Sequence, residues 1–183
     1  NSQPSLDLVR FEADKKALTL SPQLRQGTLS FRHTSPQGLS LIKTYSFTYD
    51  SYRIDLDLQV MNRTPQPLED NLALLLTNRF LKPENDSSAS FQGQLTYIDG
   101  KFKENAIDKY EKEAVATGKI QWGALADTYF MRAVVPVDPQ GIASIKTLRS
   151  APGVLKATFV LPPINLPAGA EKTLRYALYF GPR

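Results

Sequence analysis

The side chains that could carry acid–base or metal chemistry are few in this chain of 183 residues. His33 is the single histidine, and there is no cysteine. General acid–base catalysis and metal binding most often use a histidine with a second histidine or a carboxylate nearby. A single histidine at a strand end rich in serine and threonine is more often a hydrogen-bonded surface residue. The sequence therefore predicts no metal site and no catalytic histidine.

Two carboxylates, Asp55 and Asp57, lie two residues apart in an alternating segment, so they share one face of a strand. Paired carboxylates can hydrolyse glycosidic bonds. Their face is opposite to the one that carries Ile54, Leu56 and Leu58, so we interpret them as solvated charges. The chain also lacks a His-Glu-x-x-His motif, a glycine-rich phosphate loop, a Gly-x-Ser-x-Gly motif and a calcium loop. We expect neither an enzyme nor a bound cofactor.

Charge and composition exclude two further classes. The net charge of +4 is mild, and basic residues alternate with acids without a basic run interleaved with aromatics, so nucleic-acid binding is not expected. No apolar stretch reaches the roughly 18 residues that a membrane span needs. The start at Asn1, without a methionine, fits a soluble piece of a larger membrane protein. The length predicts one domain over residues 1–183.

Hydrophobic alternation with a period of two indicates strands over most of the chain. The clearest signal runs from Leu39 to Val60 and is interrupted by Asp50-Ser51, which predicts an antiparallel hairpin. Residues 68–81 fit a helix or a strand, and we prefer a strand. Residues 105–115 fit a short helix or an exposed loop. About ten short strands with many proline and glycine turns predict an all-β sandwich of antiparallel sheets with at most short helices.

Three large rings, Trp122, Tyr129 and Phe130, are expected to form the structural core. Burying each ring stabilises a fold by roughly 1.5–3 kcal/mol, and Trp122 is the single tryptophan. The alternative is that one ring faces a groove and contacts a partner.

Three motifs in order resemble a known family. The first, Lys43–Phe47 followed by alternating Tyr52–Asn62, is similar to the central hairpin of the large periplasmic domain of YidC/Oxa-type membrane-protein insertases. The second, Trp122 with Asp127–Phe130 and the later Pro136, resembles the Trp-x6-Tyr-Phe-x5-Pro run of that domain. The third, the ending Leu178-Tyr179-Phe180-Gly181-Pro182-Arg183, resembles the point where the domain gives way to the helix leading into the membrane.

The resemblance implies a twisted β-super-sandwich like that of galactose mutarotases, on the periplasmic side of the bacterial inner membrane. It implies a non-catalytic part of an insertase and chaperone that helps to insert and fold membrane proteins. The implied partners are accessory subunits of the Sec translocon and nascent membrane proteins. The family domain usually begins with a Gly-Gly strand segment, which is missing before Leu6. The first strands of the family domain are therefore expected to be absent from residues 1–183.

Two other functions fit the residues. A carbohydrate-binding sandwich of mutarotase type could stack sugars on tyrosine and tryptophan, although one histidine argues against mutarotase catalysis. A secreted adhesin is the third hypothesis. For partner binding we favour the stretch from Arg63 to Lys103, because it combines a polar loop with an edge-like strand. Its predicted protein-binding residues are Lys82, Glu84 and Phe91.

Overall fold

The computed structural model describes residues 9–80, 91–139 and 141–183, which form antiparallel strands and one short 3₁₀ helix, η2 (Ile107–Tyr110). The all-β prediction is confirmed. The strands are β1 (Glu12–Ala13), β2 (Gln26–Thr34), β3 (Leu39–Thr48), β4 (Arg53–Asn62), β5 (Leu68–Asp70), β6 (Ala73–Arg79), β7 (Gln92–Ile98), β8 (Lys101–Ala106), β9 (Ala114–Ala116), β10 (Ile120–Asp127), β11 (Phe130–Pro136), β12 (Ser144–Ala151), β13 (Val154–Val160), β14 (Ile164–Leu166) and β15 (Glu171–Pro182).

The chain forms two compact units, which are described separately. The first unit contains residues 1–69 and 165–175, and the second contains residues 70–164 and 176–183. The prediction of one domain over residues 1–183 stays a prediction.

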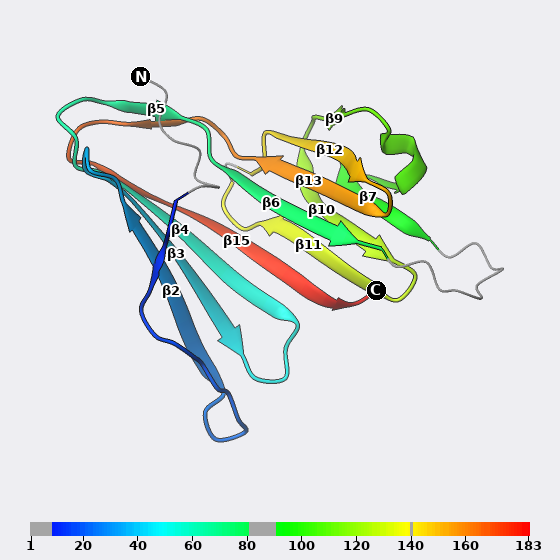
Figure 1. Ribbon diagram of the computed structural model, residues 1–183, viewed down its shortest axis with the longest axis horizontal. Coiled ribbons are helices and arrows are strands. Elements are labelled where there is room, and N and C mark those ends of the chain that lie inside the picture. Colours follow the sequence, from blue (N-terminus) through cyan, green and yellow to red (C-terminus); the bar gives the residue numbers. More distant parts are fainter. Residues whose placement is uncertain (1–8, 81–90, 140) are drawn as a thin grey trace. The chain divides into compact units, whose positions relative to one another are not determined.

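The first unit contains an antiparallel sheet with the strand order β1-β2-β3-β4 followed by residues 171–175 of β15 (Figure 1). The predicted hairpin is confirmed as β3 and β4, which pair with Tyr45 opposite Leu56. Asp50 turns the chain between them with φ of 61°. Leu56 and Leu58 are buried, whereas Asp55 on the opposite face is exposed. The alternation in the sequence therefore separates a covered face from a wet one.

Asn62, the last residue of β4, ties several segments of the first unit together. Its side chain is fully buried, and its Nδ2 donates hydrogen bonds to the carbonyl oxygens of Gln66 (2.8 Å), Leu166 (2.9 Å) and Pro167 (3.2 Å). Its Oδ1 accepts hydrogen bonds from the backbone N–H (3.1 Å) and the hydroxyl (2.7 Å) of Thr64. One amide thus satisfies polar groups from segments about a hundred residues apart in the sequence.

The second unit is a sandwich of two sheets. One sheet has the strand order β15-β11-β10-β7-β8, with residues 176–182 of β15, and the other has the order β6-β13-β12-β9 (Figure 1). Gly123 of β10 lies where the sheets are in contact, because a Cβ atom there would be 2.6 Å from Cδ1 of Ile145 and 2.8 Å from Cε1 of Phe159. The core between the sheets contains fully buried side chains from β10, β12 and β13: Leu125, Ile145, Leu155 and Phe159.

Two ambiguous segments of the sequence are resolved. The preference for strand over helix in residues 68–81 is confirmed by β5 and β6, over the part that the structure describes. Residues 105–115 contain η2 and the beginning of β9. The predicted turn at Asp99-Gly100 joins β7 and β8, with both residues at positive φ (53° and 72°), as a two-residue hairpin of type I′ requires.

No helix within the described residues is long and apolar enough to span a membrane.

Candidate functional site

Of the residues considered for catalysis, His33 lies on β2, and Asp55 and Asp57 lie on β4, two strands away in the sheet of the first unit. His33 on β2 is partly buried, and its Nδ1 lies 3.1 Å from the carbonyl oxygen of Arg10. Asp55 forms an ion pair with Arg53 at 2.7 Å, and Asp57 lies 3.8 Å from Arg175. These are solvent-exposed ion pairs, which usually contribute little to stability. Within residues 9–80, 91–139 and 141–183, no group of three or more histidines and carboxylates could hold a metal ion.

The prediction that Tyr129 and Phe130 lie in the core is wrong, because their side chains are 74% and 60% exposed. Oδ1 of Asp127 accepts hydrogen bonds from the backbone N–H groups of both residues, each at 2.8 Å. This Asx-type turn closes the β10–β11 hairpin and leaves both rings at its tip. The aspartate two residues before Tyr129 is the local signal that indicates a turn rather than a buried strand.

Trp122 is partly buried and lies on the face of β10 opposite to Gly123, away from the four-stranded sheet. Its ring centroid is 6.4 Å from that of Tyr97 and 6.0 Å from that of Phe102. It packs against four buried side chains from β7, β10 and β11: Leu95, Ala124, Ala126 and Ala133. The tryptophan thus belongs to an apolar cluster on the outer face of the sandwich, not to the core between its two sheets.

The predicted partner-binding residues have different outcomes. Lys82 and Glu84 lie outside the described residues. Phe91 packs against the apolar cluster beside Trp122, and the guanidinium carbon of Arg183 lies 4.9 Å from its ring centroid. Binding of a partner through these three residues stays a prediction.

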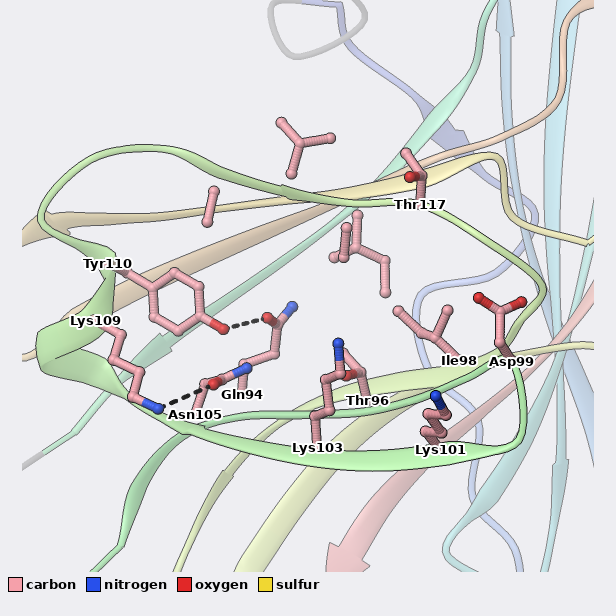
Figure 2. A pocket seen from close by; sticks show the side chains of 14 residues that line it. Gln94, Thr96, Ile98, Asp99, Lys101, Lys103, Asn105, Lys109, Tyr110 and Thr117 are labelled. Atoms are coloured by element: carbon pink, nitrogen blue, oxygen red, sulfur yellow. Dashed lines mark hydrogen bonds between the residues drawn. The ribbon is translucent and has the colours of Figure 1, made fainter.

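A cavity of about 530 Å³ opens in the second unit beside η2. It lies on the face of β7 and β8 that is directed toward β9 and β12 (Figure 2). Ammonium, hydroxyl and amide groups line most of it, and aliphatic side chains form the rest of its wall. The lining residues are Gln94, Thr96, Ile98, Asp99, Lys101, Lys103, Asn105, Lys109, Tyr110, Ala114, Val115, Ala116, Thr117 and Ile145.

A buried chain of hydrogen bonds supports one end of the cavity. The Tyr110 hydroxyl donates to Oε1 of Gln94 at 2.6 Å, and Nε2 of Gln94 donates to Oγ1 of Thr147 at 2.7 Å (Figure 2). Burial raises the pKa of the Tyr110 hydroxyl, and its hydrogen bond with the Asn105 side chain opposes that rise. All three residues of the chain are nearly inaccessible to solvent. Satisfied buried networks of this kind hold their members rigidly, so η2 is fixed relative to β7 and β12.

Comparison with solved structures defines the class of the fold. The chain is similar to a galactose mutarotase-like protein from Lactobacillus casei, with a TM-score of 0.62 and 13% sequence identity over 93% of this chain and 72% of that chain. At this identity the similarity concerns the fold alone. The chain is thus a β-sandwich of the galactose mutarotase-like class, as predicted.

Comparison of sequences identifies the family within this class. The family described as the YidC periplasmic domain matches residues 1–183. The membrane protein insertase YidC of Citrifermentans bemidjiense is 31% identical over 86% of this chain. That of Coxiella burnetii is 30% identical over the full length of this chain. The chain belongs to the YidC periplasmic domain family. It spans 29% and 33% of the length of these two relatives.

Proposed function

We propose that this chain is the periplasmic part of an inner-membrane insertase and acts without catalysis, as a protein-interaction or spacing module. The proposed partners are accessory subunits of the Sec translocon and nascent membrane proteins. The family match over residues 1–183 is the observation that carries the proposal. In the described residues, the candidate catalytic groups His33, Asp55 and Asp57 lie on the surface with backbone or arginine partners, which favours a binding role.

Exposed rings in the second unit also support protein binding. Tyr129 and Phe130 are largely exposed at the β10–β11 tip, and Phe102 on the edge strand β8 is 53% exposed. The backbone N–H of Arg183 donates to the carbonyl oxygen of Tyr129 at 2.8 Å, which holds the tip against the end of β15. Rigidly held, exposed aromatic side chains are typical of residues that dominate protein interfaces.

The test of the partner surface is a pull-down of purified Sec accessory subunits with this chain as bait. Charge reversals Lys82→Glu and Glu84→Lys are expected to reduce recovery several-fold, since charge complementarity governs association at polar surfaces. Lys156→Glu on β13 is the control, because Lys156 is exposed and lies outside the stretch 63–103. Unchanged recovery with both reversals would reject this surface.

A second experiment tests whether the exposed rings contact nascent membrane proteins. Photo-crosslinkers placed at Tyr129 and Phe130 of the full-length protein are expected to capture inserting apolar segments. A crosslinker at Lys156 serves as the control position. The proposal as a whole would be contradicted by a parent reading frame that encodes no membrane spans on either side of this chain.

A further inference from the structure

We propose that the cavity beside η2 binds a phosphorylated polyol, that is, a small molecule with a phosphate monoester and several hydroxyl groups. This binding site is additional to the protein-interaction function proposed above and does not depend on it. The proposal rests on the charge of the cavity, on the direction of the strands that line it, on one hydroxyl that has no partner within the described residues and on its size.

The described lining of the cavity carries more ammonium groups than carboxylates. Lys101, Lys103 and Lys109 line it, together with the single acid Asp99. Within the described part of the chain, none of the three ammonium groups forms an ion pair. Three ammonium groups and one carboxylate leave a net charge of +2. A phosphate monoester carries about −1.5 to −2 at pH 7, so the charges match.

The strand register directs these lysines into the sandwich. On β8, Lys101 and Lys103 lie opposite Ile98 and Thr96 of β7, and Asn105 lies opposite Gln94, so the two lysines share the cavity-facing side of the sheet while remaining exposed to solvent. The inner faces of sandwich sheets ordinarily carry apolar side chains. Figure 2 shows the Lys103 ammonium group directed into the cavity, above the strand from which it arises. Inward lysines also protect the edge strands of sheets from pairing with other chains, so the test below includes that role.

The Thr96 hydroxyl is a polar group that a ligand in the cavity could contact. Thr96 is 3% exposed and lines the cavity, and among the described residues its hydroxyl forms no hydrogen bond with the protein; because no described polar atom is both buried and unpartnered, its oxygen is accessible from the cavity. Beside it, Oδ1 of Asn105 accepts a hydrogen bond from Nζ of Lys109 at 3.3 Å, and the Asn105 side chain also bonds the Tyr110 hydroxyl, so one amide N–H of Asn105 is left to donate to a ligand (Figure 2). These groups suit a hydroxylated molecule.

The size and the walls of the cavity fit a small organic molecule. Its volume of about 530 Å³ lies within the range of roughly 300–1,000 Å³ that is typical of small-molecule sites. Ile98 and Ile145 supply apolar wall for a carbon skeleton. Asp99, whose Oδ1 accepts the backbone N–H of Lys119 at 2.8 Å, can also accept hydrogen bonds from ligand hydroxyls. Lysine ammonium groups bind phosphate as point charges, so Lys101 and Lys103 are assigned to the phosphate.

The experiment is a calorimetric titration of the 183-residue chain with glycerol 3-phosphate, with glycerol and inorganic phosphate as separate probes. Lys103→Gln is expected to weaken binding at least about tenfold, because a charge-assisted hydrogen bond is lost. Thr96→Val, which keeps the side-chain shape, is expected to weaken it about threefold or more. Lys146→Gln is the matched control, because Lys146 alternates with Ile145 and Thr147 on β12 and so points away from the cavity. Circular dichroism verifies that each variant is folded.

A second arm distinguishes a soluble phosphate from a lipid headgroup. Sedimentation with phosphatidylcholine vesicles that contain phosphatidic acid, compared with pure phosphatidylcholine, tests the lipid source. Binding that depends on Lys103 and Thr96 in either arm supports the site and identifies its source. The proposal is overturned if neither probe binds saturably, if Lys146→Gln is as damaging as Lys103→Gln, or if inorganic phosphate binds as tightly as glycerol 3-phosphate. Aggregation of Lys103→Gln with unchanged ligand affinity would assign the lysines to edge protection and would also overturn it.

Discussion

Replacement of Asn62 by alanine is expected to destabilise the first unit strongly. The side chain is fully buried and bonds to backbone carbonyl groups near residues 66 and 166 and to Thr64. The backbone of Asn62 adds two further bonds, from its N–H to the Ala170 carbonyl oxygen (2.9 Å) and from the Gly169 N–H to its own carbonyl oxygen (2.7 Å). An alanine keeps these two backbone bonds and loses every bond of the amide. The perturbation therefore isolates the side chain.

The magnitude follows from the lost bonds. Each intramolecular hydrogen bond contributes about 0.5–1.5 kcal/mol net, and a buried carbonyl left without a donor costs about 1–3 kcal/mol. The two N–H groups of the amide are shared among three carbonyl oxygens. The hydrogen bond to the carbonyl oxygen of Leu166 is buried. Loss of both donors and of the acceptor for Thr64 should lower the free energy of unfolding by about 3–5 kcal/mol. That is a large fraction of the roughly 5–15 kcal/mol of a typical domain.

The assay is urea unfolding of the chain followed by circular dichroism. Asn165→Ala is the matched control, since Asn165 is exposed and makes one long hydrogen bond to Glu69 (3.4 Å), so its replacement should change stability by less than about 0.5 kcal/mol. A loss of under about 1 kcal/mol for Asn62→Ala, with an unchanged denaturant slope, would refute the reasoning.

The substitution Asn62→Asp tests the same hydrogen bonds through the pH dependence of the free energy of unfolding. A carboxylate in this place would face carbonyl oxygens in a buried environment, so its pKa in the folded state is expected to be raised above the unfolded value. The folded state would then bind the proton more tightly, and stability would increase as the pH falls through that folded pKa. Unfolding of this variant measured from pH 7 to pH 4 is expected to show partial recovery, because a protonated carboxyl can donate one hydrogen bond. A variant that is equally unstable across this range would contradict the donor role of Nδ2.

Three further predictions concern the second unit. Gly123→Ala is expected to lower the free energy of unfolding by about 1–3 kcal/mol, because its Cβ would lie 2.6 Å from Ile145 Cδ1 and force the sheets apart; an unchanged urea midpoint would show that the sheets adjust freely. Tyr129→Ser and Phe130→Ser should each change the free energy of unfolding by under about 0.5 kcal/mol, because their rings are exposed. Losses of about 3–5 kcal/mol, which are typical of core rings, would show that these rings are buried. Burial, with the Asp138 carboxylate adding to it, raises the pKa of Tyr176 from 10.0 to about 12, so the unfolded chain loses this proton first and stability falls between pH 10 and 12. Tyr176→Phe should weaken that alkaline dependence, and identical alkaline curves for variant and parent would contradict it.

Parts of the fold that depend on neighbouring residues were predictable. The β3–β4 hairpin follows from alternation, because the side chains of a strand point to opposite faces and only one face of this sheet is covered. The turn at Asp99-Gly100 follows from residues that tolerate positive φ. The family could also be identified from the sequence, since its motifs are short runs of aromatic, aliphatic and turn residues.

The assignment of rings to the core was the part that failed. Tyr129 and Phe130 are as hydrophobic as many core residues, but two hydrogen bonds to Asp127 place them on a hairpin tip. Trp122 lies in a cluster on the outer face of a sheet, which composition cannot distinguish from the core between two sheets. The hydrophobicity of a ring indicates how much its burial would stabilise the fold. It does not indicate which residues lie close enough to bury the ring.

By itself, the sequence determined the strand periodicity, the turns and the family, because each depends on residues adjacent along the chain. Only the tertiary structure decided which aromatic rings are covered and where the cavity lies. Tyr110, Gln94 and Thr147 form one hydrogen-bonded chain although Gln94 and Thr147 are 53 residues apart in the sequence, and the lysines of β8 lie on its cavity-facing side because of its register with β7. Such contacts arise when distant strands pair and two sheets meet. Local propensity carries no information about which strands will do so.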